Sequence, residues 1–166
     1  MARSVRRTVL LCGEGKAEEA LFRHLRVLYL SGRENPPKVT PKKAGGKGSN
    51  NVIATLLGQA ACVRYDRLVA CLDMDLPPDA DALHAAQKKK VVRVELYPCL
   101  EGFLLDILGI AVPEDSATCK QRLRQIDMRD PYAPGFFEDR FPRDVLDARR
   151  GAVPALDVLL KVYEDG

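Results

Sequence analysis

The fold of this chain is decided first by residues 8–25, TVLLCGEGKAEEALFRHL. An apolar run, Thr8 to Cys12, opens the stretch with residue types that favour a β-strand. Gly13-Glu14-Gly15 follows, which is the punctuation expected where a strand turns into a helix. Apolar residues then recur at spacings of three and four, at Ala17, Leu21, Leu25 and Leu28. We therefore predict a strand, a tight turn and a helix up to about residue 30.

The same order repeats along the next eighty residues. A short strand is predicted around Val39, and a helix capped by Asn50 or Asn51 follows it. Residues 67–72 read as a strand buried on both faces, and helix 79–89, strand 91–96 and helix 100–109 come next. Alternation of this kind implies right-handed crossovers. We predict an α/β fold with a mostly parallel sheet of about four strands and helices on both of its faces.

The pattern weakens after Pro113. Helices are predicted at about residues 116–125, 143–150 and 153–164, around a turn-rich segment from Asp127 to Pro142. We therefore assign residues 1–112 to the α/β domain and residues 113–166 to a helical C-terminal extension packed on the same domain.

Composition excludes several classes of protein. With 166 residues, 46% of them hydrophobic and 30% charged, the chain fits one ordinary globular domain. No apolar run approaches the roughly 20 residues that a membrane span needs, and none suits a secretory signal, so we predict a cytoplasmic protein with no membrane partner. The five cysteines include no C-x-x-C pair, which favours reduced thiols over a zinc site or disulfides.

Charge is distributed unevenly. The net charge of +3 combines +6 over residues 1–126 with −3 over residues 127–166. Between Asn35 and Tyr65 there is no acidic residue, whereas basic residues occur at Lys38, Lys42, Lys43, Lys47 and Arg64. Such a segment suits an anionic partner, and a solvated basic loop is the alternative interpretation.

Acidic residues gather just after the predicted strands. Glu14 follows the first strand, Asp73 and Asp75 follow the strand through Leu72, and Glu101 comes soon after the strand through Leu96. Ligands of an open parallel sheet bind beyond the carboxyl ends of its strands. In an extended Asp73-Met74-Asp75 the two carboxylates share a face and Met74 points into the core. Oxygen ligands of this kind suit Mg²⁺, and helix capping by Asp73 or Asp75 is the alternative.

Other site chemistries find less support. Neither the Gly46-Lys47-Gly48 segment nor Gly13-Glu14-Gly15 completes a nucleotide-binding glycine motif. His24 and His84 fall inside predicted helices and are interpreted as structural or surface residues. Cys99 is interpreted as a small buried residue near the site.

The motifs together resemble the TOPRIM (topoisomerase-primase) domain, a Rossmann-like fold. Glu14-Gly15-Lys16-Ala17-Glu18 after one strand and Leu72-Asp73-Met74-Asp75 after another are similar to its strand-end glutamate and its Asp-x-Asp pair. The resemblance is closest to two small prokaryotic branches of the family, the OLD-family nucleases and the RloB-like proteins. The segment Pro98-Cys99-Leu100-Glu101 resembles a Pro-Cys-Phe-Glu segment of the RloB-like proteins, with Leu100 in place of the aromatic residue. The resemblance covers residues 8 to about 109, with Ala17 in place of a common threonine.

The resemblance implies a site for Mg²⁺ or Mn²⁺ at Glu14, Asp73 and Asp75, with Glu18 and Glu101 as further acidic members. It also places Lys120 as a candidate basic residue on the scissile phosphate. The chain carries no ATPase domain such as the OLD enzymes have, so a separate ATPase subunit is a candidate partner.

The leading hypothesis is metal-dependent cleavage of phosphodiester bonds in nucleic acid, DNA or RNA, in prokaryotic defence or DNA processing. Phosphate contacts are assigned to Lys16, Lys42, Lys43 and Lys47, without base reading, because the segment has no aromatic residue for stacking. Two alternatives stay open: a non-catalytic or partner-dependent nucleic-acid-binding subunit, and phosphoryl transfer on a small nucleotide.

Overall fold

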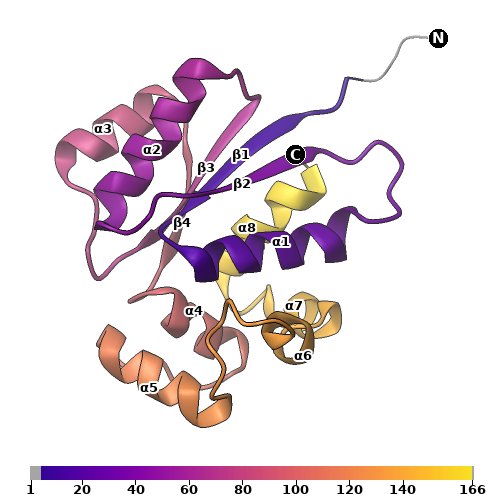
Figure 1. The fold of residues 1–166 in the computed structure, drawn as a ribbon, viewed down its shortest axis with the longest axis vertical. Coiled ribbons are helices and arrows are strands. Elements are labelled where there is room, and N and C mark those ends of the chain that lie inside the picture. Colours follow the sequence, from indigo (N-terminus) through magenta and orange to yellow (C-terminus); the bar gives the residue numbers. More distant parts are fainter. Residues whose placement is uncertain (1–4, 166) are drawn as a thin grey trace.

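The computed structural model of the chain describes residues 5–165. Within these residues there are four strands and eight helices; strands and helices alternate up to α4, and only helices follow (Figure 1). In chain order they are β1 (Thr8–Gly13), α1 (Lys16–Leu30), β2 (Lys38–Lys43), α2 (Gly48–Cys62), β3 (Arg67–Asp73), α3 (Ala80–Lys88), β4 (Val92–Leu96), α4 (Leu100–Ile107), α5 (Ser116–Ile126), α6 (Phe136–Arg140), α7 (Arg143–Arg149) and α8 (Pro154–Asp165).

The strands form one parallel sheet in the order β2-β1-β3-β4. The chain runs outward from β1 to β2, then crosses back to β3 and runs outward the other way to β4. A strand order that reverses in this manner leaves a crevice between β1 and β3, beyond their carboxyl ends. The predicted α/β fold is confirmed, and its arrangement is of the Rossmann-like type.

Alternating side chains along the strands supply two cores. Leu10 and Cys12 of β1 face a core that α2 and α3 cover, with Val52, Ile53 and Ala86 among its members. Val9 and Leu11, on the other face, belong to a larger core that α1, α4 and α8 cover. Both faces of the central strands β1 and β3 are therefore buried over most of their length, which explains their near-continuous apolar runs in the sequence.

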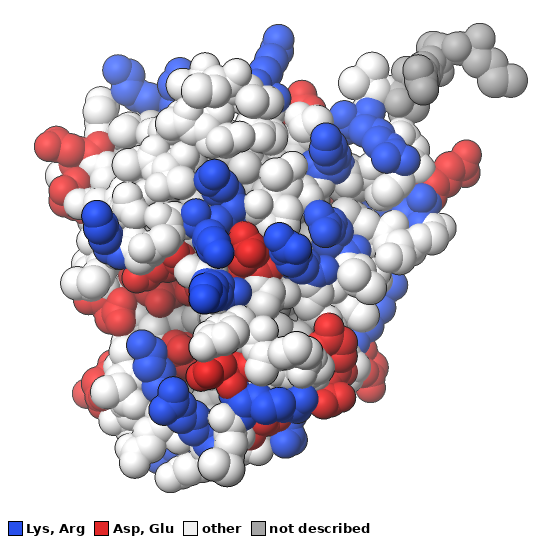
Figure 2. All heavy atoms as spheres, viewed as in Figure 1, with Lys and Arg blue, Asp and Glu red and all other residues white. Residues whose placement is uncertain are grey.

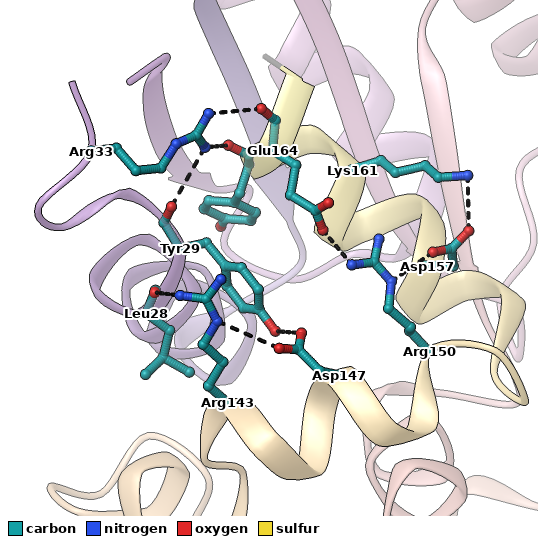
Figure 3. A network of polar contacts seen from close by, with 10 residues as sticks. Leu28, Tyr29, Arg33, Arg143, Asp147, Arg150, Asp157, Lys161 and Glu164 are labelled. Carbon is teal, nitrogen blue, oxygen red and sulfur yellow. Dashed lines mark hydrogen bonds and ion pairs between the residues drawn. The ribbon is translucent and has the colours of Figure 1, made fainter. Parts of the chain in front are cut away.

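The C-terminal helices share the larger core (Figure 1). The buried Tyr163 of α8 donates its hydroxyl hydrogen bond to the carbonyl oxygen of Phe22 in α1, at 2.8 Å. A polar network continues this contact at the surface, where Arg33 donates to the carbonyl oxygen of Tyr163 at 2.7 Å and Tyr29 donates to Asp147 at 2.6 Å (Figure 3). α8 thus packs both on α1 and directly on β4 of the sheet.

Two local expectations were wrong. The second helix begins at Gly48 and not at an asparagine cap, since Lys47 precedes it in the left-handed region with φ 69°. Asn51 instead uses its side-chain amide to hold the preceding loop, donating to the carbonyl oxygens of Ala44 and Gly46. The turn-rich segment from 127 to 142 contains α6, because Phe136 and Phe137 are buried there.

None of the helices in residues 5–165 combines the length and the apolar character that a membrane span requires.

Candidate functional site

The turn between β1 and α1 presents Glu14 at the crevice. Gly13 has to be glycine there, because a Cβ atom on it would lie 2.5 Å from the Cβ of Glu18. The Glu18 carboxylate turns back and accepts a hydrogen bond from the amide of Gly15 at 3.0 Å, so it caps the first turn of α1 while remaining buried. Glu14 is half-buried at the same turn.

The end of β3 carries Asp73 and, just beyond it, Asp75. Met74 packs against the core under α2 and α3, as the sequence predicts. Neither aspartate caps α3, since that role belongs to Asp79, whose carboxylate accepts from the amide of Ala82 at 2.8 Å. The capping interpretation of the Asp-x-Asp pair is therefore wrong.

The segment after β4 brings the third acidic motif to this edge. The amide of Met74 donates to the carbonyl oxygen of Leu96, and the amide of Asp75 donates to that of Pro98 at 2.8 Å. These bonds fix the start of α4, with Glu101 in its first turn, beside the end of β3. Gly102 allows the close packing, because a Cβ atom on it would lie 2.5 Å from the carbonyl oxygen of Tyr97. Cys99 is buried, as predicted.

Electrostatics show that the five predicted acidic residues act on one another. Burial has the largest effect on the pKa of Asp73, and together with the charges of Glu18, Glu14, Asp75 and Glu101 it raises this pKa from 3.8 to about 8. Burial also raises the pKa of Glu18, hydrogen bonds from the backbone oppose this, and the charges of Glu14 and Glu101 add to the increase. Four separate elements thus bring carboxyl groups within mutual electrostatic range.

No cation of the protein neutralises this group within residues 5–165. The ion pairs of the described residues involve other acids, and the five carboxylates take part in none of them. In the same part of the chain, no three His, Cys, Asp or Glu side chains stand in an arrangement that holds a metal ion as drawn. The site is a gathering of acidic side chains, among which Glu18 and Asp75 already accept hydrogen bonds.

The backbone amide of Gly15 donates to Glu18, and the side chain of Ser116 donates to Asp75. The hydroxyl of Ser116, the first residue of α5, donates to Oδ2 of Asp75 at 2.6 Å. Sequence reasoning missed Ser116, since 41 positions separate it from Asp75. The only sequence signal for Ser116 was its position at the start of a helix, directly after Asp115, whose carboxylate caps α5 by accepting from the amide of Thr118.

The basic segment lies beside the acidic residues. Parallel pairing sets Lys42 opposite Cys12 and Lys43 opposite Gly13, one residue before Glu14. The loop after β2 then docks on the turn, because the amides of Gly45 and Gly46 both donate to the carbonyl oxygen of Glu14, at 2.9 and 3.0 Å. Lys and Arg side chains crowd the middle of this face, with Asp and Glu between and beside them (Figure 2).

The remaining predicted lysines lie around this edge with different surroundings. Lys43 and Lys47 are exposed, Lys42 is half-buried, and all three belong to β2 or the loop after it. Lys16 begins α1 and is exposed, with its Nζ 5.8 Å from the ring centroid of Tyr132. Lys120 is exposed on α5, one turn beyond Ser116. Within residues 5–165, Lys120 forms no ion pair with the acidic residues.

The side chain of Ser49 connects α2 to the acidic edge of the sheet. The buried Ser49 donates its hydroxyl to the carbonyl oxygen of Asp73 at 2.8 Å, which ties the start of α2 to the end of β3. Sequence reasoning gave Ser49 no role, because a serine near a helix start is too common a signal.

The two histidines lie apart from the acidic group. His24 is buried, its Nε2 is 2.7 Å from the carbonyl oxygen of Phe141, and its ring stacks on Phe137. His84 is exposed on α3. The structural and surface interpretations are confirmed.

Comparison with known proteins gave no matching family model, and no significant match to a curated protein or to a solved structure.

Proposed function

We propose that this chain is a divalent-metal-dependent phosphodiesterase of the TOPRIM type that cleaves nucleic acid. The observation that carries the proposal is the gathering of five carboxyl groups at or just beyond the ends of β1, β3 and β4, where burial and the other four charges raise the pKa of the half-buried Asp73. A fold gains nothing in stability from gathering uncompensated acids at a sheet edge, so such a cluster is a candidate for function. Its position at the point where the strand order reverses is also where α/β sheets bind ligands.

The donor set fits Mg²⁺ or Mn²⁺. Both ions favour carboxylate oxygens and commonly take one or two from the protein, with water and substrate phosphate completing the shell. Glu14, Asp73 and Asp75 would hold the ion, since they stand at the ends of β1 and β3. Glu18 and Glu101 would add negative charge around it. When bound, such an ion supplies an activated water and stabilises the charge that develops on phosphate.

The chain's own residues have separable roles in this proposal. Ser116 orients Asp75 through its 2.6 Å hydrogen bond. The Glu18 carboxylate, which accepts a hydrogen bond from the Gly15 amide, fixes the conformation of the turn that carries Glu14. The docked loop holds Lys47 beside the same edge. We place Lys120 near the scissile phosphate only through the resemblance to TOPRIM nucleases.

The basic segment supports an anionic substrate over a small neutral one. Lys42, Lys43, Lys47 and Lys16 would contact phosphate oxygens along a strand of nucleic acid. Contacts of this kind carry no sequence information and weaken as salt rises. We therefore expect binding that is salt-sensitive and tolerant of base sequence.

The test is a nuclease assay on single-stranded and duplex DNA and RNA, with magnesium and then manganese. Asp73→Ala and Asp75→Ala should each lower cleavage about a hundredfold or more, because each removes an ion ligand. Asp81→Ala is the matched control, since Asp81 is an exposed aspartate on α3 outside the acidic group. Equal cleavage by the wild type and both site variants would contradict the proposal.

A binding subunit without turnover is the second candidate. It is favoured by the hydrogen bonds that already occupy Glu18 and Asp75. It predicts that the wild type binds nucleic acid in the same assay mixtures and leaves it uncut. A partner-dependent subunit would cut only after an ATPase partner is added.

A further inference from the structure

A second cavity lies at the opposite end of the sheet from the acidic group. It is partly open to solvent, has a volume of about 810 Å³, and is bordered by the end of α2, the start of β3 and the turn between α3 and β4. Because β3 runs from Arg67 to Asp73, the two ends of this strand are about 20 Å apart. A ligand in this cavity therefore does not touch the acidic residues.

Uncompensated positive charge is the first property of this cavity. Four basic side chains line it, namely Arg64, Arg67, Lys89 and Lys90. Within residues 5–165 none of the four makes an ion pair or a side-chain hydrogen bond. Figure 2 shows Lys and Arg side chains at the top of the molecule, where Figure 1 places the end of α2.

The one acid in the lining, Asp66, is already engaged. Its carboxylate accepts hydrogen bonds from the amide and the hydroxyl of Thr8, at 2.7 and 3.0 Å. Those bonds and the charges of Arg64 and Arg7 lower its pKa. Asp66 therefore secures the start of β1 and leaves most of the positive charge free for an anion.

An apolar and aromatic wall is the second property. Leu57, Leu68 and Val92 are half-buried in the lining, next to the ring of Tyr65. Gln59 donates to the hydroxyl of Tyr65 at 3.3 Å and so restrains the ring. The helix dipole offers another explanation for the lysines at the end of α3, because cations are favourable near a helix C-terminus. It does not explain Arg64, Arg67 or the apolar wall.

We propose that this cavity binds a free nucleoside phosphate, with the base against the Tyr65 wall and the phosphate among the four basic side chains. The volume lies within the range of small-molecule sites, which combine an apolar lining with a few well-placed polar groups. Arginine suits phosphate because its guanidinium can donate two parallel hydrogen bonds.

The test is a nuclear magnetic resonance titration of the full ¹⁵N-labelled chain with adenosine 5′-monophosphate, in a chelator. The chelator prevents metal-bridged binding of the phosphate at the acidic edge, so failure here is distinguishable from failure of the nuclease proposal. We expect saturable shifts of the amides of residues 62–68 and 89–92. Adenosine and inorganic phosphate should each bind at least about tenfold more weakly, because each lacks one half of the contacts.

Single substitutions of the basic side chains test whether they contact the phosphate of the bound nucleotide. Arg64→Gln and Lys89→Gln should each weaken binding about tenfold. Both residues are exposed, so neither change threatens folding. Arg122→Gln, which removes an exposed charge on α5, should leave the affinity unchanged.

Four results would overturn the proposal. These are shifts confined to the acidic edge, inorganic phosphate binding as tightly as the nucleotide, equal loss in Arg122→Gln, and an oligonucleotide that shifts these amides where the nucleotide does not. The last would assign the surface to a nucleic-acid strand.

Discussion

At the scale of single residues, Asp73 is where stability and proposed function oppose each other. Its pKa of about 8 lies above the usual value of about 3.9, so the folded state favours the protonated form. The stability it contributes is complete below the unfolded-state pKa and is lost as pH rises from about 4 toward 8.

Asp73→Asn should therefore stabilise the metal-free protein at neutral pH. We expect a gain on the order of 2–4 kcal/mol at pH 7, since each pKa unit corresponds to about 1.4 kcal/mol, and almost none at pH 4. Thermal unfolding at both pH values measures it, with Asp81→Asn as control. Added magnesium should raise the Tm of the wild type and not that of Asp73→Asn. A variant no more stable than wild type at pH 7 would show that the carboxyl is not under electrostatic strain.

Gly13 provides a steric prediction at the same scale. Gly13→Ala places a Cβ atom 2.5 Å from that of Glu18, where something has to shift, and should cost about 1–3 kcal/mol in urea unfolding. Gly58→Ala is the control, because Gly58 lies in α2 with no atom within 4 Å of the added Cβ. That change should stabilise by about 0.5–1 kcal/mol. If Gly13→Ala stabilised the protein as much as Gly58→Ala does, the turn after β1 would not be tightly packed.

At the scale of elements, Asp127 joins the end of α5 to α6. Its carboxylate accepts from Arg129 at 2.7 Å and from Arg140 at 3.1 Å, and these arginines hold the pKa of Asp127 well below its usual range. The stability it provides is present above the unfolded-state pKa of about 3.9 and is lost as pH falls below it.

Asp127→Asn should consequently lower the Tm at pH 7, and its difference from the wild type should shrink as pH falls below 4. Melting curves from pH 7 to pH 3 measure both proteins, with Asp144→Asn, an exposed aspartate at the start of α7, as control. If the difference in Tm between wild type and variant did not change with pH, the charge of Asp127 would not be the source of its stabilising effect.

Elements with strong periodicity were predictable and the connections were not. The run Arg67 to Leu72 identifies β3, and the stripe through Leu21 and Leu25 identifies α1, because burial selects their residue types directly. The start of α2 was mispredicted, since it depends on the left-handed Lys47 and on a loop held by Glu14 carbonyl contacts. The acidic group followed from topology, whereas Ser116 joined it through packing of α5 that no local pattern encodes.

At the scale of the whole molecule, the C-terminal helices and the sheet form one packed unit. Leu159, Leu160 and Tyr163 of α8 are buried in the same core as β1 and β3. The network of Arg33, Arg143 and Arg150 then ties α1, α7 and α8 together at the surface (Figure 3).

A chain shortened to residues 1–112 should therefore fail to fold cooperatively, because one face of its sheet loses part of its cover. The full chain should melt in a single transition by both circular dichroism and tyrosine fluorescence. Tyr163→Phe, which removes only the hydrogen bond to Phe22, should lower stability by about 1–2 kcal/mol and keep the single transition. A cooperative melt of the shortened chain would show that residues 113–166 are dispensable for the fold.

The strand order has a last consequence, for local opening. β1, which ends at Gly13 just before Glu14, and β3, which ends at Asp73, each pair with a neighbour on both sides. β2, which carries Lys42 and Lys43, pairs on one side only. Amide hydrogens of the two central strands should exchange with solvent only through large openings, and those of β2 through small ones. Asp73 thus stands on, and Glu14 directly follows, the slowest-exchanging backbone of the sheet, whereas Lys42 and Lys43 stand on a faster-exchanging strand. The basic strand can therefore shift while the acidic edge keeps its shape.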